Sequence, residues 1–174
     1  MEDFKKYGFL SDELALTRNR SRLIVLVDMD GVMCDFDASR EKWLAEDFNR
    51  NKEDFENVSN LFENLQPMPG AIEAFKRLYE EYDPFLVSTA PWDNPSGYTG
   101  KRIWVENYLG NIGKKRLILT HDKSLIKGDI LIDDRLKNGV IGFKGYHIRF
   151  GSEDYPTWDR TLYAIYEYNQ TFRL

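Results

Sequence analysis

The stretch VDMDGVMCDF, residues 27–36, places three aspartates within eight positions. The first two, Asp28 and Asp30, directly follow an apolar run of strand length at residues 23–27. Clustered carboxylates repel one another, and a hard cation held between them relieves that repulsion. Sites that are rich in oxygen and keep several water ligands suit Mg²⁺. The stretch therefore indicates a magnesium site at the end of a buried strand.

Three further apolar runs also end in polar side chains. A hydroxyl group and a lysine beside the metal would complete a pocket for a phosphoryl group, because its oxygens are bound by cations and hydrogen-bond donors. The sequence thus predicts phosphate chemistry. The side chains are Ser88 and Thr89 after residues 85–87, His121, Asp122 and Lys123 after residues 117–119, and Asp133 and Asp134 after residues 130–132.

The elements that must position these side chains alternate along the chain. Apolar runs of strand length are separated by segments with helical spacing, which indicates right-handed crossovers and a mainly parallel sheet covered on both faces. Ligands of such open sheets bind beyond the carboxyl ends of the strands. We therefore predict a three-layer α/β fold. The expected strands are 23–27, 85–87, 117–119, 130–132 and 146–150, and the clearest helices are 71–79, 101–109 and 161–168.

One stretch, residues 38–66, breaks the alternation because it contains no strand-like run. Its apolar residues recur at near-helical intervals, and the stiff linker Pro67-Met68-Pro69-Gly70 closes it. We expect a small helical cap here, inserted after the first strand into a core made of residues 1–37 and 67–174. Residues 1–21 form an N-terminal extension to which no role is assigned.

Composition and charge limit the classes of function. The 174 residues, 42% of them hydrophobic, fit one packed domain with a small insertion. A formal net charge of −5 argues against binding to a nucleic-acid polymer, which selects broad basic surfaces. The chain shows neither a secretory signal nor an apolar run of about 18 residues, so we expect a cytoplasmic protein without a membrane span. Its single cysteine cannot form an internal disulfide.

Four motifs of the chain resemble those of the haloacid dehalogenase superfamily, in the same order. The run DMDGV at residues 28–32 is similar to the first motif, DxDG[TV], and Thr89, Lys123 and the pair Asp133-Asp134 are similar to the second, third and fourth. The closer resemblance is to the 5'(3')-deoxyribonucleotidases. It spans residues 23–135 and rests on VDMDGVMCDF, PMPGA, STAP, RIWVENYLG, LTHDKS and DILIDDR.

The resemblance implies a Rossmann-like core, a cap that supplies selectivity, and a Mg²⁺-dependent phosphomonoesterase acting on nucleoside monophosphates. Asp28 would be the nucleophile that forms an aspartyl phosphate. Asp30 would protonate the leaving oxygen and later deprotonate the attacking water. Mg²⁺ would bind the Asp28 carboxylate, the Asp30 backbone carbonyl and the Asp134 carboxylate. Asp133 would hold a metal-bound water.

The substrate preference is left open by the sequence. Thr89 and Lys123 would bind phosphoryl oxygens, but Asp93 stands where the deoxyribonucleotidases carry a further phosphate-binding lysine. This reversal of charge favours another small ester, such as a sugar phosphate, as the alternative substrate. Trp92 lies in the same Pro- and Gly-rich loop, PWDNPSGY, and either contacts the substrate or packs within the loop.

The cap aromatics and the assembly each allow more than one interpretation. The spacing of the aromatics favours a small helical core for most of them over a base-stacking pocket. Arg135 is interpreted as a structural salt-bridging residue. A non-catalytic binding module with the same fold is the third functional class, and the complete set of motif residues argues against it. Dimerisation is common in such domains, so a homodimer is compatible with the sequence. The aromatics in question are Trp43, Phe48, Phe55 and Phe62.

Overall fold

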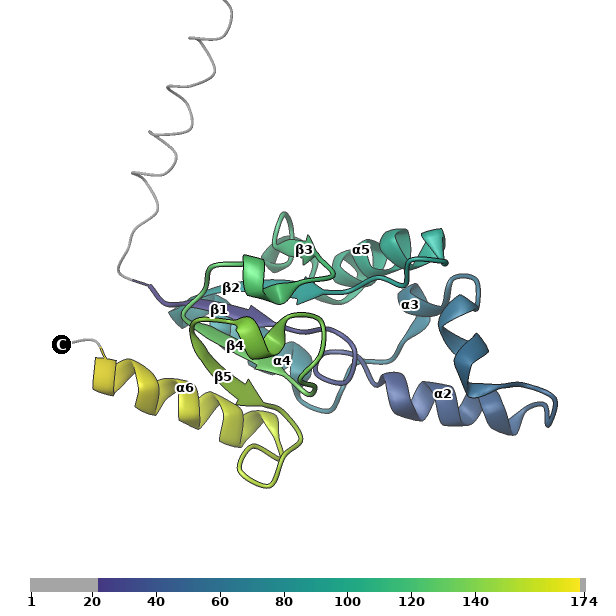
Figure 1. Ribbon diagram of the computed structural model, residues 1–174. Coiled ribbons are helices and arrows are strands. Elements are labelled where there is room, and N and C mark those ends of the chain that lie inside the picture. Colours follow the sequence, from purple (N-terminus) through teal and green to yellow (C-terminus); the bar gives the residue numbers. More distant parts are fainter. Residues whose placement is uncertain (1–21, 173–174) are drawn as a thin grey trace, which may run out of the picture.

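A five-stranded parallel sheet forms the centre of the protein (Figure 1). The computed structural model describes residues 22–172, so the expected N-terminal extension at residues 1–21 lies outside the described part. The strand order is β3-β2-β1-β4-β5, and each neighbouring pair is parallel, which confirms the predicted α/β class. The strands are β1 (Ile24–Val27), β2 (Asp83–Ser88), β3 (Leu117–Leu119), β4 (Ile130–Asp133) and β5 (Tyr146–Arg149).

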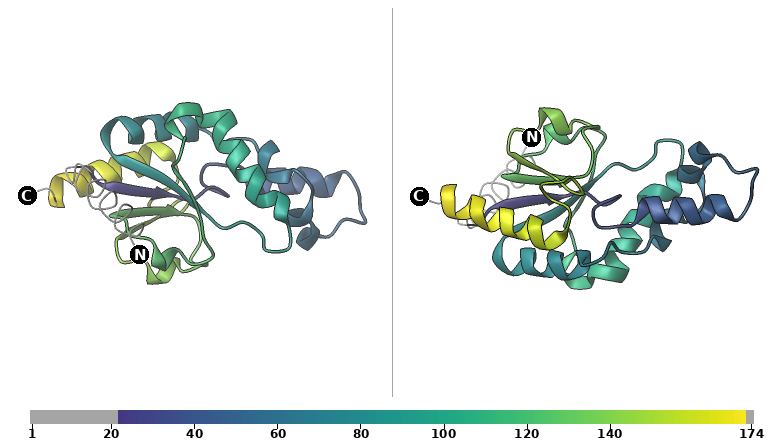
Figure 2. Two further views of the ribbon diagram at one scale, coloured as in Figure 1. Left: turned by 90° about the horizontal axis from the view of Figure 1, so that it is seen from above. Right: turned by 90° about the horizontal axis from the view of Figure 1, so that it is seen from below.

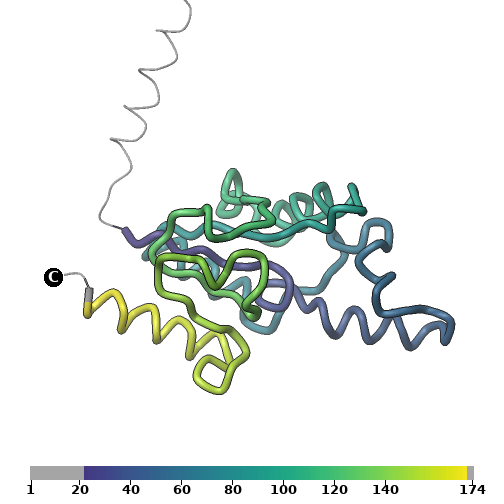
Figure 3. The backbone as a smooth tube through the Cα atoms, viewed as in Figure 1, coloured from purple at the N-terminus to yellow at the C-terminus, as the bar shows by residue number. Residues whose placement is uncertain are grey.

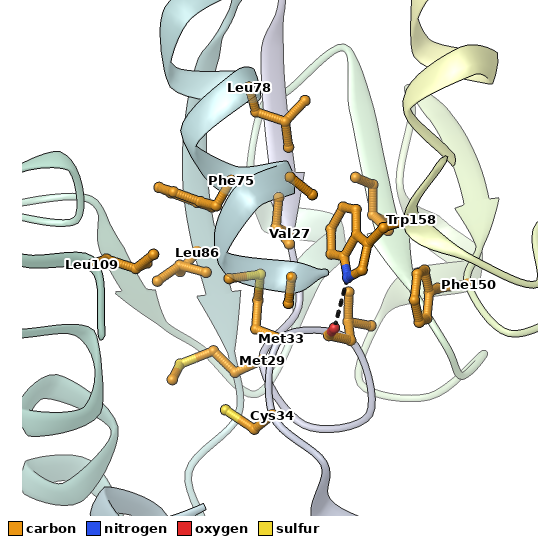
Figure 4. Packing of buried hydrophobic residues seen from close by; sticks show 14 of the residues in the cluster. Val27, Met29, Met33, Cys34, Phe75, Leu78, Leu86, Leu109, Phe150 and Trp158 are labelled. Atoms are coloured by element: carbon orange, nitrogen blue, oxygen red, sulfur yellow. Dashed lines mark hydrogen bonds between the residues drawn. The ribbon is translucent and has the colours of Figure 1, made fainter. Parts of the chain in front are cut away.

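Three helices cover one face of the sheet. They are α4 (Ala71–Glu81), α5 (Pro95–Leu109) and α6 (Trp158–Phe172), and their apolar sides join the larger core cluster with alternate residues of the strands. Figure 4 shows Phe75 of α4 and Trp158 of α6 on either side of Val27. The indole Nε1 of Trp158 donates a hydrogen bond to the Val32 carbonyl at 3.3 Å, which fastens α6 to the loop after β1.

Short turns cover the opposite face of the sheet (Figure 2). The 3-10 turns η3 (Lys123–Leu125) and η4 (Val140–Gly142) lie in the two connections on this side. Only residues 120–129 and 134–145 link the strands here, so these crossovers carry single turns where α-helices are usual. Within residues 22–172, none of the helices on either face combines the length and hydropathy that a membrane crossing needs. The side chains buried between these turns and the sheet are Leu26, Val87, Leu131, Val140 and Phe143.

The stretch between β1 and α4 forms only helices and turns and projects beyond the carboxyl end of the sheet (Figures 2 and 3). We call residues 36–64 the helical segment. The chain enters and leaves it at one place, because the Asp35 amide donates to the Gln66 carbonyl and the Met68 amide donates to the Met33 carbonyl, each at 2.8 Å. The elements of the segment are α2 (Phe36–Ala45), η1 (Lys52–Asn57) and α3 (Leu61–Asn64).

Most aromatic side chains of the helical segment form its core, as the spacing predicts. The Phe55 ring lies 5.1 Å from that of Phe36 and 5.5 Å from that of Trp43, measured between centroids. Phe62 is buried and stacks on Phe36 at 6.2 Å. Phe48 is the exception, since it lies in the turn between α2 and η1 with its side chain fully exposed.

Helix α5 begins at Pro95, well before the predicted start at residue 101. Asn94 caps it, with its side-chain oxygen accepting from the Ser96 amide at 3.1 Å. The first turns of the helix contain two glycines. Because glycine lowers helix propensity, the sequence does not indicate a helix before residue 101. The structure explains one of them: a Cβ on Gly100 would lie 3.1 Å from the Glu63 backbone nitrogen. The glycine therefore allows α3 to pack closely against α5.

Candidate active site

A cavity of about 110 Å³ lies at the carboxyl ends of β1, β2 and β4, where the predicted motif residues meet. The strands carry these residues to one edge of the sheet because they are parallel and adjacent. Phe36, Glu56 and Phe62 of the helical segment line the cavity from the other side. The lining residues that the sequence predicts for the site are Asp28, Asp30, Ser88, Thr89, Lys123 and Asp133.

Two acidic side chains of the site share one buried lysine. The Nζ of Lys123 lies 2.9 Å from Asp28 Oδ1 and also forms an ion pair with Asp133. Lys123 is buried at the start of η3, and its amide donates to the Asn138 carbonyl at 2.7 Å. Burial weakens the screening of these charges by water, so the ammonium holds both carboxylates in place.

The acidic side chains after β1 and β4 fit a hard divalent cation. Oxygens of Asp28, Asp133 and Asp134 lie within 4.8 Å of one another. The Oδ1 atom of Asp134 is buried and has no hydrogen-bond partner among the described residues. Gly31 has a φ of 83°, and a Cβ there would lie 2.6 Å from Asp134 Oδ2. The loop after β1 thus approaches Asp134 as closely as only a glycine allows, and the oxygen-rich donor set suits Mg²⁺.

Burial raises the pKa of three carboxyl groups at this site. Burial and the neighbouring Asp28 raise the pKa of Asp133 from its ordinary value of 3.8 to about 6, although Lys123 acts against the shift. Burial is also the main cause that raises the pKa of Asp30 and of Asp134. Without a cation, Asp133 of the folded protein therefore holds a proton between about pH 4 and pH 6 that the unfolded chain would release.

This shift predicts a pH dependence of stability for the metal-free protein. Because the folded-state pKa of Asp133 lies above the unfolded value, the contribution of Asp133 to stability is fully present below about pH 4 and is lost as the pH rises through about 6. Asp133→Asn removes this contribution. We expect the melting temperature of the wild type, relative to Asp133→Asn, to fall by roughly 5 °C between pH 4 and pH 7. Thermal melts in chelator would measure it, and parallel pH profiles would contradict it.

Of the residues predicted to bind substrate, some line the cavity and others do not. Thr89 lines the cavity, and its Oγ1 donates to the Thr120 carbonyl at 2.8 Å. Trp92 lies outside the lining and is 78% exposed, with its ring edge-to-face against His121. Asp93 is exposed and also lies outside the lining. The charge reversal at Asp93 therefore lies away from the cavity itself.

Two basic residues that form ion pairs with the predicted acidic residues were not recognised in the sequence as part of the site. Lys101 of α5 is fully buried, with its Nζ 2.6 Å from Asp30 Oδ2. Its position on the buried side of α5, three residues before Trp104, is a signal that could have found it, because a lysine there needs a partner. Arg135 forms the expected ion pair with Asp134 at 3.2 Å, but it also lines the cavity.

The fold of the chain has a counterpart among solved structures. The chain is similar to YfnB of Bacillus subtilis, described as a HAD-hydrolase and solved bound to magnesium, with a TM-score of 0.52 and 14% sequence identity. The match covers 83% of this chain and 98% of the other. The two chains therefore share a fold, and the Rossmann-like core that the sequence predicts is confirmed.

Comparisons of sequence define the family. Residues 54–158 match the profile of the family described as 5' nucleotidase, deoxy (pyrimidine), cytosolic type C protein. A protein of Vibrio phage KVP40 assigned as a 5'(3')-deoxyribonucleotidase is 42% identical over 83% of this chain and 85% of its own length. The human cytosolic-type 5'(3')-deoxyribonucleotidase is 31% identical over 80% and 79% of the two chains. The chain belongs to this family and is a phosphoric monoester hydrolase of the 5'-nucleotidase type.

Proposed function

We propose that the protein is a Mg²⁺-dependent 5'(3')-deoxyribonucleotidase that acts through an aspartyl phosphate. The observation that carries the proposal is the meeting of Asp28, Asp30 and Lys123 at one cavity, beside the acidic pair Asp133-Asp134. These are the groups that phosphoryl transfer to a carboxylate needs: a nucleophile, an acid, a cationic side chain and a cation site. The family relatives add support, since their names assign them to deoxyribonucleotides.

The reaction would proceed in two displacements. A carboxylate oxygen of Asp28 attacks phosphorus, and the bond from phosphorus to the sugar oxygen breaks. Asp30 gives its proton to that oxygen, so that the nucleoside leaves as a neutral alcohol. Asp30 then removes a proton from water, which attacks the aspartyl phosphate and releases inorganic phosphate. The first step leaves Asp30 as the carboxylate that acts as a base in the second step. The second step restores the protonated Asp30 and the free Asp28 carboxylate that the first step needs.

The acidic cluster would hold the metal. Asp28, Asp134 and the backbone carbonyl of Asp30 are the proposed ligands of Mg²⁺, and Asp133 would hold one of its waters. Bound Mg²⁺ would neutralise charge on the phosphoryl oxygens. The unpartnered Asp134 Oδ1 supports this assignment, because a buried carboxylate oxygen is seldom left without a donor or a cation.

The substrate would be held by groups from both sides of the cavity. Lys123 and Thr89 are the proposed phosphoryl ligands, and the Thr89 hydroxyl would have to turn from the Thr120 carbonyl to donate to the phosphate. We further propose that the helical segment is a cap for the ester's leaving group. The rings of Phe36 and Phe62 in the lining favour a partly apolar group such as a nucleoside over a bare sugar.

Initial rates of phosphate release test the proposal. The substrates are matched deoxy- and ribonucleoside 5'-monophosphates, 3'-monophosphates and sugar phosphates, each assayed with Mg²⁺ and with a chelator. We expect deoxynucleotides to be hydrolysed at least roughly tenfold more efficiently than sugar phosphates, and the chelator to abolish turnover. Faster release from sugar phosphates would move the protein to another substrate class. Turnover that persists in chelator would refute the metal assignment.

A further inference from the structure

Lys101 carries a buried positive charge for which the reaction above has no use. Its Nζ lies 2.6 Å from Asp30 Oδ2 and 3.0 Å from Ser88 Oγ. The same atom lies 4.4 Å from the centre of the Phe62 ring. An ammonium group has three hydrogen-bond donors, so a carboxylate, a hydroxyl and an aromatic face account for all of them. The charge is held in one place by three partners.

The position of Lys101 is fixed by the packing of three different elements. Helix α5 presents the lysine, Ser88 ends β2, and Phe62 belongs to α3. The close approach of α3 to α5 at Gly100 brings the Phe62 ring over the ammonium. The cost of removing a charge from water is often not fully offset by a buried ion pair, so this lysine is retained beside Asp30 at the expense of stability. Groups that weaken a fold in this way are concentrated at functional sites.

The contact leaves the two oxygens of Asp30 in different states. Oδ2 accepts from Lys101, whereas Oδ1 is buried and has no hydrogen-bond partner among the described residues. The two lysines buried within residues 22–172 thus serve different aspartates, because Lys123 pairs with Asp28 and Asp133. Lys101 thus fixes the orientation of the Asp30 carboxyl group through one of its two oxygens.

We propose that Lys101 is a positioning residue for the acid, which fixes the Asp30 carboxyl group through Oδ2 in the orientation from which it protonates the leaving oxygen. The proposal rests on the function proposed above, in which Asp30 is that acid. As the bond from phosphorus to the sugar oxygen breaks, the proton moves from the Asp30 carboxyl group to this oxygen, and the negative charge left on Asp30 is balanced by the Lys101 ammonium. Lys101 itself contacts neither the phosphoryl group nor the proton that is transferred.

The test compares two esters that differ in their need for an acid. The leaving group of a deoxyribonucleoside 5'-monophosphate is an unstable alkoxide unless an acid protonates its oxygen. The leaving group of p-nitrophenyl phosphate is a phenolate, which is stable without a proton. We expect Lys101→Met to lower kcat/KM roughly 100-fold for the nucleotide and less than tenfold for the aryl ester. The ratio of the two values is measured on one preparation, so it does not depend on the fraction of folded protein. Arg102→Met is the matched control, because Arg102 is the next residue of α5 and is exposed.

The variant Asp30→Asn separates this proposal from the one on which it rests. If Asp30 is the acid, Asp30→Asn shows the same selective loss, and adding Lys101→Met to it lowers the nucleotide rate no further. An Asp30→Asn variant that loses both esters equally would overturn the acid assignment. A selective loss in Asp30→Asn together with an equal loss of both esters in Lys101→Met would overturn the role of Lys101 alone.

A second substitution covers the case in which Lys101→Met does not fold. In Lys101→Gln the side-chain amide can still donate one hydrogen bond toward Asp30. We expect it to show a selective loss on the nucleotide that is smaller than the loss expected for Lys101→Met, roughly tenfold. A ratio of the two esters equal to that of the wild type would overturn the proposal.

Discussion

Asp28→Asn is expected to lower kcat/KM for nucleoside monophosphates by at least roughly 10⁴-fold, because the amide has no anionic oxygen with which to attack phosphorus. Asp28 lies at the end of β1, and its Oδ1 is held by Lys123, so the asparagine would occupy the same place without its reactivity. Phosphate release under excess Mg²⁺ measures the loss. Acid quenching with labelled substrate should trap a protein-bound phosphate in the wild type and none in Asp28→Asn.

The control for Asp28→Asn is a carboxylate outside the cavity. Asp37 lies in the first turn of α2, where it pairs with Arg40 at 2.7 Å on the protein surface. Asp37→Asn should therefore keep the activity of the wild type. Residual turnover above about one per cent in Asp28→Asn, with wild-type folding, would show that another group is the nucleophile.

Lys123→Met is expected to affect both stability and activity. It would leave the buried carboxylates of Asp28 and Asp133 without their shared cation, which costs roughly 3–5 kcal/mol of unfolding free energy in the metal-free protein. Mg²⁺ should restore part of this loss, since it supplies positive charge at the same place. We expect kcat/KM to fall roughly 10³-fold, because a cation facing the phosphoryl oxygens is lost.

Urea unfolding with and without Mg²⁺, combined with initial rates, measures both effects of Lys123→Met. The matched control is Lys127→Met, since Lys127 follows η3 closely but is exposed. It should unfold within about 0.5 kcal/mol of the wild type. An unchanged unfolding free energy in Lys123→Met would mean that the ion pairs at Asp28 and Asp133 contribute nothing to the fold.

The centre of the sheet was predictable because β1 and β4 are buried on both faces. Residues 24–27 and 130–132 therefore read as continuous apolar runs, and acidic residues follow directly after them. The order of the motifs indicated the family, and the match of residues 54–158 to the family profile confirms it. What could be predicted is thus mainly what is encoded locally, by a strand and the few residues that follow it.

The rest depends on contacts between distant parts of the chain. Lys101 and Asp30 are 71 residues apart, and no local pattern says that α5 brings them together. Phe48 has the same helical spacing as Phe55, but the turn after α2 points it into solvent. Trp92 and Asp93 are near Thr89 in sequence, but neither of them lines the cavity. Tertiary packing decides these cases.

The hydrogen bonds that join the two ends of the helical segment have a consequence for how such enzymes diversify. Because residues 33–35 and 66–68 are neighbours in space, the loop between them can change in length or sequence without pulling on β1. An insertion there would reshape the side of the cavity that Phe36, Glu56 and Phe62 line, while Asp28 and Asp30 kept their positions. In evolution, and equally in the laboratory, exchange of the helical segment can change the selectivity while the reaction stays the same.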